Sequence, residues 1–384
     1  MELMVSFPSV VDVAVVGAGP AGSSAAIEAA RAGAITLILD RAEFPRYKTC
    51  GGGLIGPTLR SLPAGLGIPV KQEIFGATFT NKGRGAKNRR TGKPALVLVD
   101  RAEFDDALLR RAIDEGAVAR LGTAVSAIRE DRDAVTLTTA QGQVQARYVI
   151  GADGSASRIA RHVGVSLSQV DLGLEAEVDG ADAAAKWQGR IHLDWGPIRG
   201  SYGWVFPKGR ILTVGVIARK GSPDETRKYL ARFIRERGLD GCQVVRESGH
   251  LTRCRTPDSP LGKGRVLVCG DAAGLLEPWT REGISFAVRS GAMAGRIAAR
   301  AALGQATSPV RDYTDEISSS LALEMAAGFR FLSAFERHPA IMNSALTRTP
   351  VGWEAFLRMT RGDTTLAQIS RHRSVRIAME ILAR

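Results

Sequence analysis

The sequence has few cysteines, few aromatic residues and no long apolar run. Its four cysteines (Cys50, Cys242, Cys254 and Cys269) are scattered through 384 residues, with no Cys-x-x-Cys pair. This scatter argues against a disulfide framework and a zinc site, and it predicts a reduced, cytoplasmic protein without a bound metal. No stretch reaches the roughly 20 apolar residues of a membrane-spanning helix. Residues 1–10 lack the basic start and apolar core of a cleaved secretion signal.

Acidic residues are also in short supply. Lys and Arg number 52 against 39 Asp and Glu, which gives a formal net charge of +13. Such a surplus attracts nucleic acid, anionic lipid or acidic small molecules. Because no nucleic-acid-binding motif is present, we expect no nucleic-acid partner and favour contact with a membrane surface. A basic surface that only keeps the protein in solution is an equally good interpretation. The length suggests two or three globular domains.

The strongest motif lies in residues 11–41. An apolar strand at residues 13–16 ends in the turn GAGPAG (residues 17–22), an alanine-rich helix follows, and a second strand ends in Asp40. Gly17 suits the tight turn, Gly19 lets a pyrophosphate approach the backbone, and Gly22 lets helix and strand pack closely. Asp40 stands where a carboxylate can accept hydrogen bonds from a ribose. This region is predicted to bind a dinucleotide.

A loop with three consecutive glycines follows the second strand. Cys50 precedes these glycines at residues 51–53, where a backbone without side chains can pass close to a flat ring system. Cys50 is therefore either a residue at such a ring, able to supply a proton, or a small buried filler. Further on, residues 81–93 hold six basic and no acidic residues, which predicts a hairpin tip or loop that is solvated or docks on a partner. Arg101 begins a helix where a cation can meet a phosphate or the cofactor.

The remainder of the chain predicts a second, antiparallel sheet, after which the chain returns to the sheet of the cofactor-binding domain. Strands expected at residues 123–130, 134–139 and 144–150 form an antiparallel meander that leads into GADGSASR, with Asp153 and Gly154. Alternating patterns at residues 190–195, 203–206 and 211–217 predict an antiparallel sheet, on which Tyr202, Trp204 and Phe206 share one face. A later strand ends in Gly270 and Asp271 before a helix of small residues. Residues 306–384 are predicted to be helical, with breaks at Pro339, Pro350 and Gly362.

We therefore expect an α/β protein, α+β overall, in three parts. A Rossmann-like cofactor-binding domain comprises residues 1–60, 95–165 and 255–305. It is interleaved with a substrate domain built on an antiparallel sheet, residues 61–94 and 166–254. A helical C-terminal segment, residues 306–384, completes the chain.

The three motifs GAGPAG with Asp40, GADGSASRIAR and VCGDAAGLLEP together resemble the glutathione-reductase-like FAD-binding fold of aromatic hydroxylases. A finer resemblance is to the geranylgeranyl reductase family. It rests on FPRYKTCGGGL (residues 44–54), YGWVFPKG (residues 202–209) and GDAAGLLEPWTREGI (residues 270–284). Members of that family reduce isolated C=C bonds of prenyl chains on lipids or quinones, with reduced FAD as hydride donor. The resemblance implies FAD as the resident cofactor of this chain.

The motifs and the resemblance together place site residues along the chain. Cys50 is the catalytic candidate, as a proton source alone or with a nearby water. The residues expected at FAD are Gly17, Gly19, Pro20, Ala21, Gly22, Asp40, Arg41, Cys50, Gly51, Gly52, Arg101, Ala124, Asp153, Gly154, Gly270, Asp271, Gly283 and Ile284. Those expected to line a prenyl tunnel are Tyr202, Trp204, Phe206 and Trp279. With no second GxGxxG turn, NAD(P)H is expected only as a transient donor, and a protein electron donor is the other option.

One position departs from the family pattern. A Thr-Gly-Glu-Gly turn is usual there, whereas this chain has Thr280-Arg281-Glu282-Gly283. Arg281 could neutralise a reduced flavin, bind an acidic head group of the substrate or point outward. Two other activities stay open. A hydroxylase-like flavin monooxygenase would use NAD(P)H and oxygen, although the Trp-x-Trp-x-Ile-Pro stretch of flavin halogenases is missing. Alternatively, the flavoprotein could modify a side chain of a partner protein.

Overall fold

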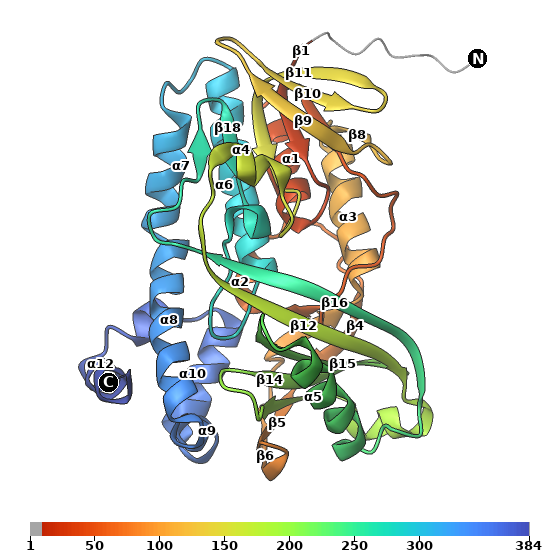
Figure 1. Ribbon diagram of the computed structural model, residues 1–384, viewed down its shortest axis with the longest axis vertical. Helices are drawn as coiled ribbons and strands as arrows, with labels where there is room; N and C mark the ends of the chain where they lie inside the picture. The colour runs from red at the N-terminus through yellow and green to blue at the C-terminus, as the bar shows by residue number, and fades with distance from the viewer. Residues whose placement is uncertain (1–9, 384) are drawn as a thin grey trace.

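The computed structural model describes residues 10–383 and has the expected mixed α/β architecture. The prediction about a secretion signal rests almost wholly on residues before this range, and Arg384 also lies outside it. An eight-stranded sheet occupies the top of the molecule in Figure 1 and a seven-stranded sheet the bottom, with helices in a column along one side. A three-stranded sheet completes the described β-structure.

The eight-stranded sheet contains the predicted strand–turn–helix unit. Its central order is β17-β18-β11-β1-β2-β8, and the strands from β18 to β8 pair in parallel. Strands β10 and β9 continue from β11 as an antiparallel meander. The bounds are β1 Val10–Val16, β2 Thr36–Leu39, β8 Val118–Arg120, β9 Val125–Glu130, β10 Val135–Thr139, β11 Gly142–Gly151, β17 Gly262–Lys263 and β18 Val266–Val268. Strand β11 thus belongs to the meander and also to the parallel sheet, which the sequence pattern alone did not indicate.

Two helices cross closely behind the first strand. Helix α1 (Pro20–Arg31) packs against α6 (Ile284–Ala302), and both are rich in alanine and glycine. A Cβ atom on Gly291 would lie 2.0 Å from the carbonyl oxygen of Ala21, and one on Gly295 would lie 2.0 Å from that of Ala25. Glycine at these two positions therefore lets the helix backbones touch. This contact ties the last cofactor motif of the chain to the first.

The seven-stranded sheet carries the predicted aromatic face. Its order is β16-β12-β15-β14-β13-β5-β6, with bounds β5 Gly76–Asn81, β6 Arg84–Arg90, β12 Leu167–Asp179, β13 Arg190–Trp195, β14 Tyr202–Lys208, β15 Ile211–Arg219 and β16 Gln243–Arg255. All pairs are antiparallel as expected except β13 with β5, which is parallel. No hairpin joins β5 to β13, which is more than a hundred residues further along the chain, so the turn geometry that forces hairpin strands to be antiparallel does not apply to this pair. The basic stretch, residues 81–93, forms the turn of the β5–β6 hairpin and the edge strand β6, so it is more than a hairpin tip.

The smaller elements lie between and around the two large sheets. The three-stranded sheet consists of β3 Gly53–Leu54, β7 Leu96–Val99 and β4 Val70–Ile74. The helices outside the C-terminal segment, besides α1 and α6, are α2 Gly56–Ser61, α3 Arg101–Asp114, α4 Arg158–Val163 and α5 Pro223–Glu236. The short 3₁₀ helices are Ala181–Trp187 and Gly270–Ala273.

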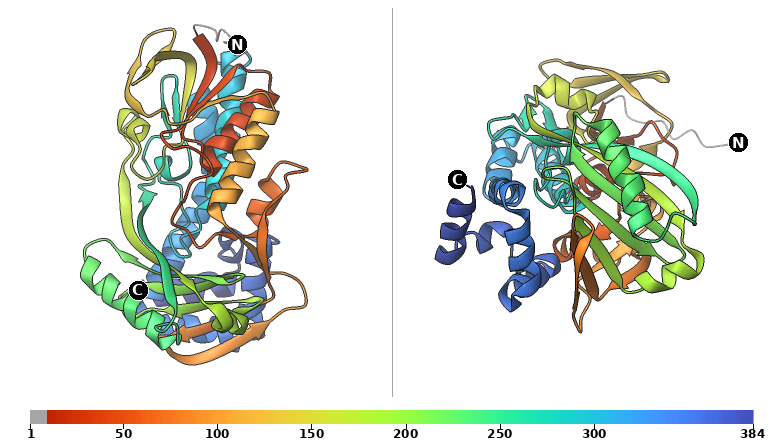
Figure 2. Two further views of the ribbon diagram at one scale, coloured as in Figure 1. Left: turned by 90° about the vertical axis from the view of Figure 1, so that its right-hand side faces the viewer. Right: turned by 60° about the horizontal axis from the view of Figure 1, so that its bottom comes forward.

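The C-terminal segment is helical, as predicted. Its helices are α7 Pro309–Ser318, α8 Leu321–Arg337, α9 Pro339–Arg348, α10 Pro350–Arg361, α11 Leu366–Ile369 and α12 Arg373–Ala383. Pro339 and Pro350 begin helices, and Gly362, with φ +75°, ends α10. Helix α7 lies beside the upper sheet (Figure 1), and Figure 2 shows the helices that follow it gathered on one side of the lower sheet. The segment thereby closes one flank of the space beneath the aromatic strand β14.

Candidate active site

One large cavity joins the two main sheets. Its volume is about 1030 Å³, and it runs from the glycine turn after β1, past the cysteine loop, to the aromatic strand β14 and helix α10. Sixteen of the predicted FAD residues line it, namely Gly17, Gly19, Pro20, Ala21, Asp40, Arg41, Cys50, Gly51, Gly52, Arg101, Ala124, Asp153, Gly154, Asp271, Gly283 and Ile284. All four predicted substrate residues, Tyr202, Trp204, Phe206 and Trp279, line it as well. Gly22 and Gly270 lie outside its lining. The fold thus brings together residues from distant segments of the chain.

The glycine turn is packed so closely that only glycine fits. Gly17 has φ +105°, and a Cβ atom there would lie 2.3 Å from the carbonyl oxygen of Ala152. A Cβ atom on Gly22 would lie 1.8 Å from the carbonyl oxygen of Gly17, so Gly22 shapes the turn from outside the cavity. Gly19 faces the cavity, with the Arg46 guanidinium 3.3 Å from the position of a Cβ atom. The turn therefore presents bare backbone at the start of α1, as anion binding requires.

Two acidic residues beside this turn accept hydrogen bonds from backbone N–H groups. Asp40 accepts hydrogen bonds from the Ala18 N–H (2.7 Å) and the Ala42 N–H (2.8 Å), so its carboxylate fastens the turn to the end of β2. Asp153 accepts from the Ser157 hydroxyl and from the Arg158 N–H at the start of α4. Burial raises the pKa of Asp153, although these hydrogen bonds oppose that rise. Direct contact of either carboxylate with FAD remains a prediction.

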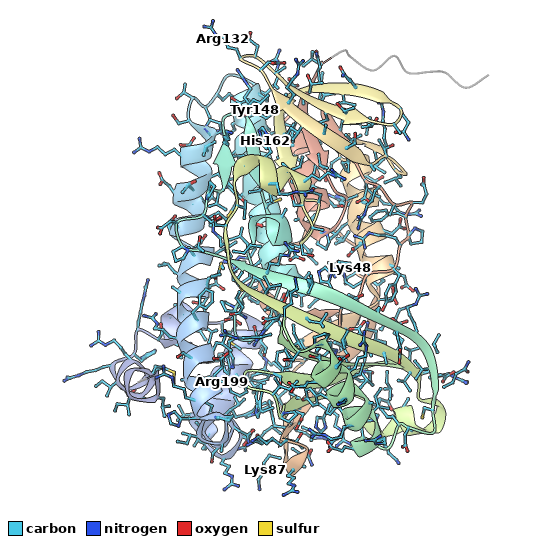
Figure 3. The ribbon with its side chains drawn as sticks, in the orientation of Figure 1. Lys48, Lys87, Arg132, Tyr148, His162 and Arg199 are labelled. Atoms are coloured by element: carbon cyan, nitrogen blue, oxygen red, sulfur yellow. The ribbon has the colours of Figure 1, made fainter. Side chains whose placement is uncertain are left out.

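A cluster of cations lines the cavity beside the turn. Arg101 donates two hydrogen bonds of 2.8 Å to the buried carboxylate of Asp105, and Arg46 lies 3.0 Å from the same carboxylate. Burial opposes the charge on Arg101, but Asp105 outweighs it and raises the pKa. The Nη1 atom of Arg46 is buried without a hydrogen-bond partner among residues 10–383. Burial lowers the pKa of Lys48, which lies in the middle of the molecule (Figure 3).

These features fit a dinucleotide such as FAD. A glycine cradle stands at a helix N-terminus, and Arg46 has a buried N–H that lacks an acceptor among the described residues. Such donors suit the two phosphates of the cofactor. Residues Arg46 and Lys48 were not named by the sequence analysis, although both lie in the quoted stretch FPRYKTCGGGL. Two cations shortly before three consecutive glycines were the available signal.

The third motif supplies an acid–base pair. The Asp271 carboxylate lies 3.5 Å from Nε2 of His250, which comes from β16. Burial would raise the pKa of Asp271, but the hydrogen bond with His250 and the positive charge of Lys48 lower it overall. Asp271 is therefore ionised at neutral pH and balances the neighbouring cations.

The cysteine loop meets the aromatic strand directly. A Cβ atom on Gly51 would lie 2.7 Å from the Phe206 ring, so the glycine is required for this contact. The Trp204 ring lies on Gly215 of the next strand, where a Cβ atom would come within 2.0 Å of it. Cys50 is a free thiol whose backbone N–H donates to the Glu175 carboxylate at 3.2 Å. The cysteine loop and the aromatic wall thus share one stretch of the cavity.

Arg281 points inward, so the outward option is wrong. Its Nε lies 3.1 Å from the Asp171 carboxylate, and the side chains of this pair are only 2% and 1% exposed. Arg281 also donates to the carbonyl oxygens of Trp279 and Gly200, and it lies over the Tyr202 ring at 5.8 Å. Its φ of +57° belongs to the left-handed region that favours glycine. A buried ion pair therefore occupies a turn for which glycine is the unstrained choice.

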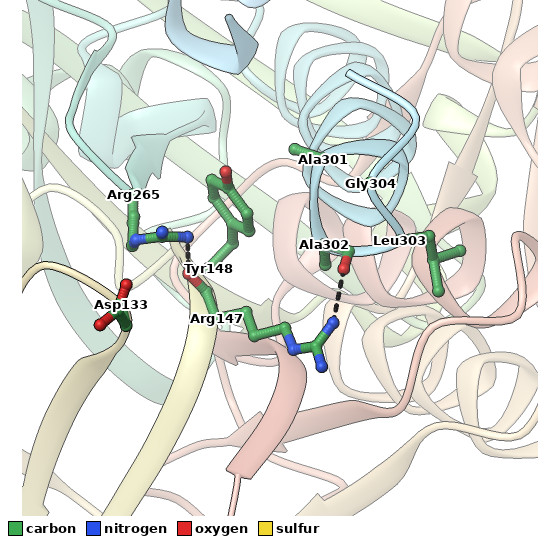
Figure 4. Close-up of a pocket in the computed structure, with 8 residues that line it drawn as sticks. All are labelled: Asp133, Arg147, Tyr148, Arg265, Ala301, Ala302, Leu303 and Gly304. Atoms are coloured by element: carbon green, nitrogen blue, oxygen red, sulfur yellow. Dashed lines mark hydrogen bonds between the residues drawn. The ribbon is translucent and has the colours of Figure 1, made fainter. Parts of the chain in front are cut away.

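A second hollow lies at the opposite end of the eight-stranded sheet (Figure 4). It has a volume of about 500 Å³ and is bordered by Arg147, Tyr148 and Arg265 and by the last residues of α6. Arg147 donates to the carbonyl oxygen of Ala302 at 2.8 Å and so caps that helix. These cations already have structural partners, and no predicted site residue reaches this hollow.

Comparison with known proteins agrees with this geometry. A sequence profile described as an FAD binding domain matches residues 10–193. Together with the cavity, this match defines the chain as an FAD-dependent oxidoreductase. It is 32% identical over 336 residues to digeranylgeranylglycerophospholipid reductase 3 of Methanosphaera stadtmanae, covering 81% of this chain and 83% of that protein.

Two further similarities point the same way. The menaquinone reductase of Mycolicibacterium smegmatis is 30% identical over 349 residues, covering 83% of this chain and 82% of that protein. A geranylgeranyl bacteriochlorophyll reductase-like crystal structure from Thermoplasma acidophilum superposes with a TM-score of 0.81 at 22% identity, over 97% of this chain and 99% of that one. This chain belongs to the geranylgeranyl reductase family. Within residues 10–383, no helix combines the length and apolar character needed to cross a bilayer.

Proposed function

We propose that this chain reduces isolated C=C bonds in the prenyl chain of a lipid or quinone, with reduced FAD as hydride donor. The observation that carries the proposal is the continuity of the cavity. One end presents a glycine turn and cations that fit a dinucleotide, and the other end is walled by aromatic and aliphatic side chains. A flavin held at the first end would face an apolar chain at the second.

The chain's residues would hold the cofactor and shape its surroundings. Gly17 and Gly19 would receive the pyrophosphate at the start of α1, with Arg46 as an additional donor. Asp40 and Asp153 keep the neighbouring backbone in place. Bound FAD supplies the hydride, which no side chain of this protein can provide.

The apolar end would exclude water and orient the alkene. An isolated C=C bond has no carbonyl group to polarise, so its reduction depends on close placement of hydride donor and proton donor. Tyr202, Trp204 and Phe206 project from one face of β14 into the cavity, and Trp279 lines it while stacking on Phe331 of α8. This wall suits the alternating methyl branches of a prenyl chain.

Cys50 is our candidate proton source, alone or with a water beside it. The thiol lines the cavity on the loop that touches Phe206, where the two ends of the cavity meet. Replacing Cys50 by Ala should slow alkene reduction at least tenfold while FAD stays bound. An unchanged rate in single-turnover measurements would remove Cys50 from the mechanism.

An anaerobic experiment tests the activity. The purified flavoprotein is reduced with dithionite, mixed with geranylgeranyl-bearing lipids or quinones, and followed by flavin reoxidation and mass spectrometry. Reoxidation with a gain of two hydrogens per double bond supports the proposal and identifies the substrate class. A flavin that stays reduced until air is admitted would favour the monooxygenase instead. Repeating the assay with NAD(P)H or a reduced carrier protein in place of dithionite would identify the donor.

We also propose that the lower end of the molecule contacts an anionic membrane. The β5–β6 hairpin carries exposed basic residues, Lys87 among them (Figure 3), and Val351 in the first turn of α10 is 80% exposed. Residues of α10 also line the apolar end of the cavity, so a lipid chain could enter from this face. Co-sedimentation with phosphatidylglycerol vesicles, but not with phosphatidylcholine vesicles, is the expected result.

A further inference from the structure

A buried carboxyl group beside the cysteine loop has no role in the chemistry described so far. Glu175 lies in the middle of β12, is 2% exposed and lines the cavity. Acidic side chains are rarely buried to this degree unless a partner or a function compensates for the missing hydration. Asp171, on the same strand, is compensated by Arg281. Glu175 has no such ion pair within 4 Å among the described residues.

The hydrogen bonds of Glu175 leave one oxygen open. Its Oε1 atom accepts from the Cys50 N–H at 3.2 Å and from the Tyr47 hydroxyl at 3.3 Å. Its Oε2 atom is enclosed and has no hydrogen-bond partner among residues 10–383. A neutral carboxyl group suits this arrangement, because Oε1 can act as the carbonyl acceptor while Oε2 carries the proton. That proton would then be a donor without an acceptor, close to the cysteine loop.

The charges around Glu175 favour a carboxyl group that exchanges its proton near neutrality. Burial is the largest influence and raises its pKa to about 7, against the opposing charge of Lys208 on β14 and the hydrogen bonds from the loop. Glu177, two residues along β12, adds to the rise. An acid whose pKa is close to the working pH can both release a proton and recover it, which is the requirement for general acid catalysis.

A hydrogen-bonded route leads from Glu175 towards the surface. The Tyr47 hydroxyl that reaches Glu175 also lies 2.9 Å from Oγ of Ser248 on β16. The Arg246 guanidinium covers the Tyr47 ring at 4.2 Å, and about half of its side chain is exposed. Ser248, at the outer end of this chain of hydroxyl groups, is itself partly exposed to solvent, whereas Glu175 at the inner end lines the cavity.

We propose that Glu175 is the proton-relay residue of the alkene reduction, an inference that rests on the proposed function. One alkene carbon receives the hydride, and the other receives a proton from the Cys50 thiol or the water beside it. The Glu175 carboxyl group gives its proton to the resulting thiolate or hydroxide and becomes a carboxylate. It recovers a proton at Oε1 from solvent through Ser248 and Tyr47, and a half-turn of the carboxyl group returns this proton to the Oε2 position. Each cycle thus consumes one hydride and one proton for each C=C bond saturated.

The decisive variant is Glu175→Gln. Glutamine keeps an acceptor oxygen for the Cys50 N–H and the Tyr47 hydroxyl, but it cannot transfer a proton. In anaerobic single turnovers with dithionite-reduced enzyme and a geranylgeranyl lipid, we expect the rate of flavin reoxidation to fall at least tenfold. The wild-type rate should fall as pH rises through about 7, because the protonated acid is depleted, and this decline should be absent from the variant.

Two controls separate a relay from a structural role. Glu247→Gln makes the same change at an exposed acid next to Ser248 and outside the cavity lining, so rate and pH profile should match the wild type. Glu175→Asp keeps an acid on a shorter side chain, so it should retain a slower rate that still depends on pH. FAD content is measured for every variant, because a loss of bound FAD would reveal a collapse of the site.

The outcomes are distinct. If the wild type saturates prenyl chains and Glu175→Gln does so at the same rate with the same pH profile, the relay is wrong and the proposed function stands. If Glu175→Gln cannot be obtained folded with FAD, a Glu175→Asp variant that reacts at the wild-type rate at every pH overturns the relay, because the shorter side chain should slow proton transfer. A wild-type protein that saturates no prenyl substrate overturns the proposed function, and the relay with it.

Discussion

The two ends of the cavity differ in what forms their walls, which is backbone at the glycine turn and side chains at the aromatic strand. At the glycine turn the wall is backbone, and added atoms at Gly17 or Gly22 would collide with carbonyl oxygens 2.3 Å and 1.8 Å away. At the other end the wall is side chain, with Trp204 and Phe206 seated on Gly215 and Gly51. A backbone wall tolerates no change of shape, whereas a side-chain wall can be reshaped by substitution. The cofactor end is therefore the constant part of the site and the aromatic end the adjustable part.

The largest effect is expected for Gly17→Ala, which adds a side-chain atom to the backbone wall at the glycine turn. The methyl group would meet the Ala152 carbonyl at a residue with φ +105°, so we expect loss of most bound FAD and destabilisation of roughly 5 kcal/mol. Gly33→Ala is the matched control, because Gly33 has φ +85° with nothing within 4 Å and should lose only about 1 kcal/mol. FAD content and chemical denaturation measure both effects. Equal losses in the two variants would mean that backbone strain, not crowding, decides the result.

A second test concerns the buried ion pair behind the aromatic end. Asp171→Asn leaves the Arg281 guanidinium buried without its counter-charge, which should cost about 3–5 kcal/mol of the free energy of unfolding. Asp106→Asn, which breaks the exposed pair with Arg110, should change it by about 0.5 kcal/mol or less. Denaturant titrations of the two variants provide the comparison. A small loss for Asp171→Asn would show that Arg281 finds other partners or reaches solvent.

A third test uses the pH dependence of stability at the border between the two ends. The folded-state pKa of Glu175, about 7, lies above the ordinary value of 4.5, so its contribution to stability is fully present below the ordinary value and is lost as pH rises through 7. Glu175→Gln removes this group. The variant should therefore gain stability relative to the wild type as pH rises from 5 to 8, by up to about 3 kcal/mol. Thermal melts across this range measure the difference, and a constant difference would place the Glu175 pKa at an ordinary value.

The smallest effect is expected at the adjustable end. Trp204→Leu removes a ring that lies on Gly215 and contacts Tyr202 at 5.9 Å between centroids. We expect the rate of prenyl reduction to fall on the order of tenfold while FAD content stays unchanged, because this ring belongs to the aromatic wall and not to the glycine turn. Single-turnover rates and FAD content measure both. If Trp204→Leu loses FAD, the aromatic wall also supports cofactor binding, and the two ends of the cavity cannot be changed independently of each other.

Much of this site could be predicted from sequence because local patterns carry it. Glycine spacing after an apolar strand, an acid at the end of the next strand and aromatics at alternate positions each reflect a geometric requirement of one segment. The cavity brings these segments together as expected. Local patterns could not show which residues far apart in the sequence form ion pairs with each other. Arg281 and Asp171 are 110 residues apart, and nothing near either one indicates the other.

Glu175 illustrates the same limit. In β12, polar and apolar residues alternate, and such alternation ordinarily places the polar side chains towards water. Both faces of this strand are partly covered, so Asp171 and Glu175 become buried instead. The sequence alone therefore determined the glycine turn, the order of elements and the aromatic face, since these depend on neighbours along the chain. Only the tertiary structure decided which charges are buried, paired or left open, because hydration and ion pairing depend on atoms that distant segments bring into contact.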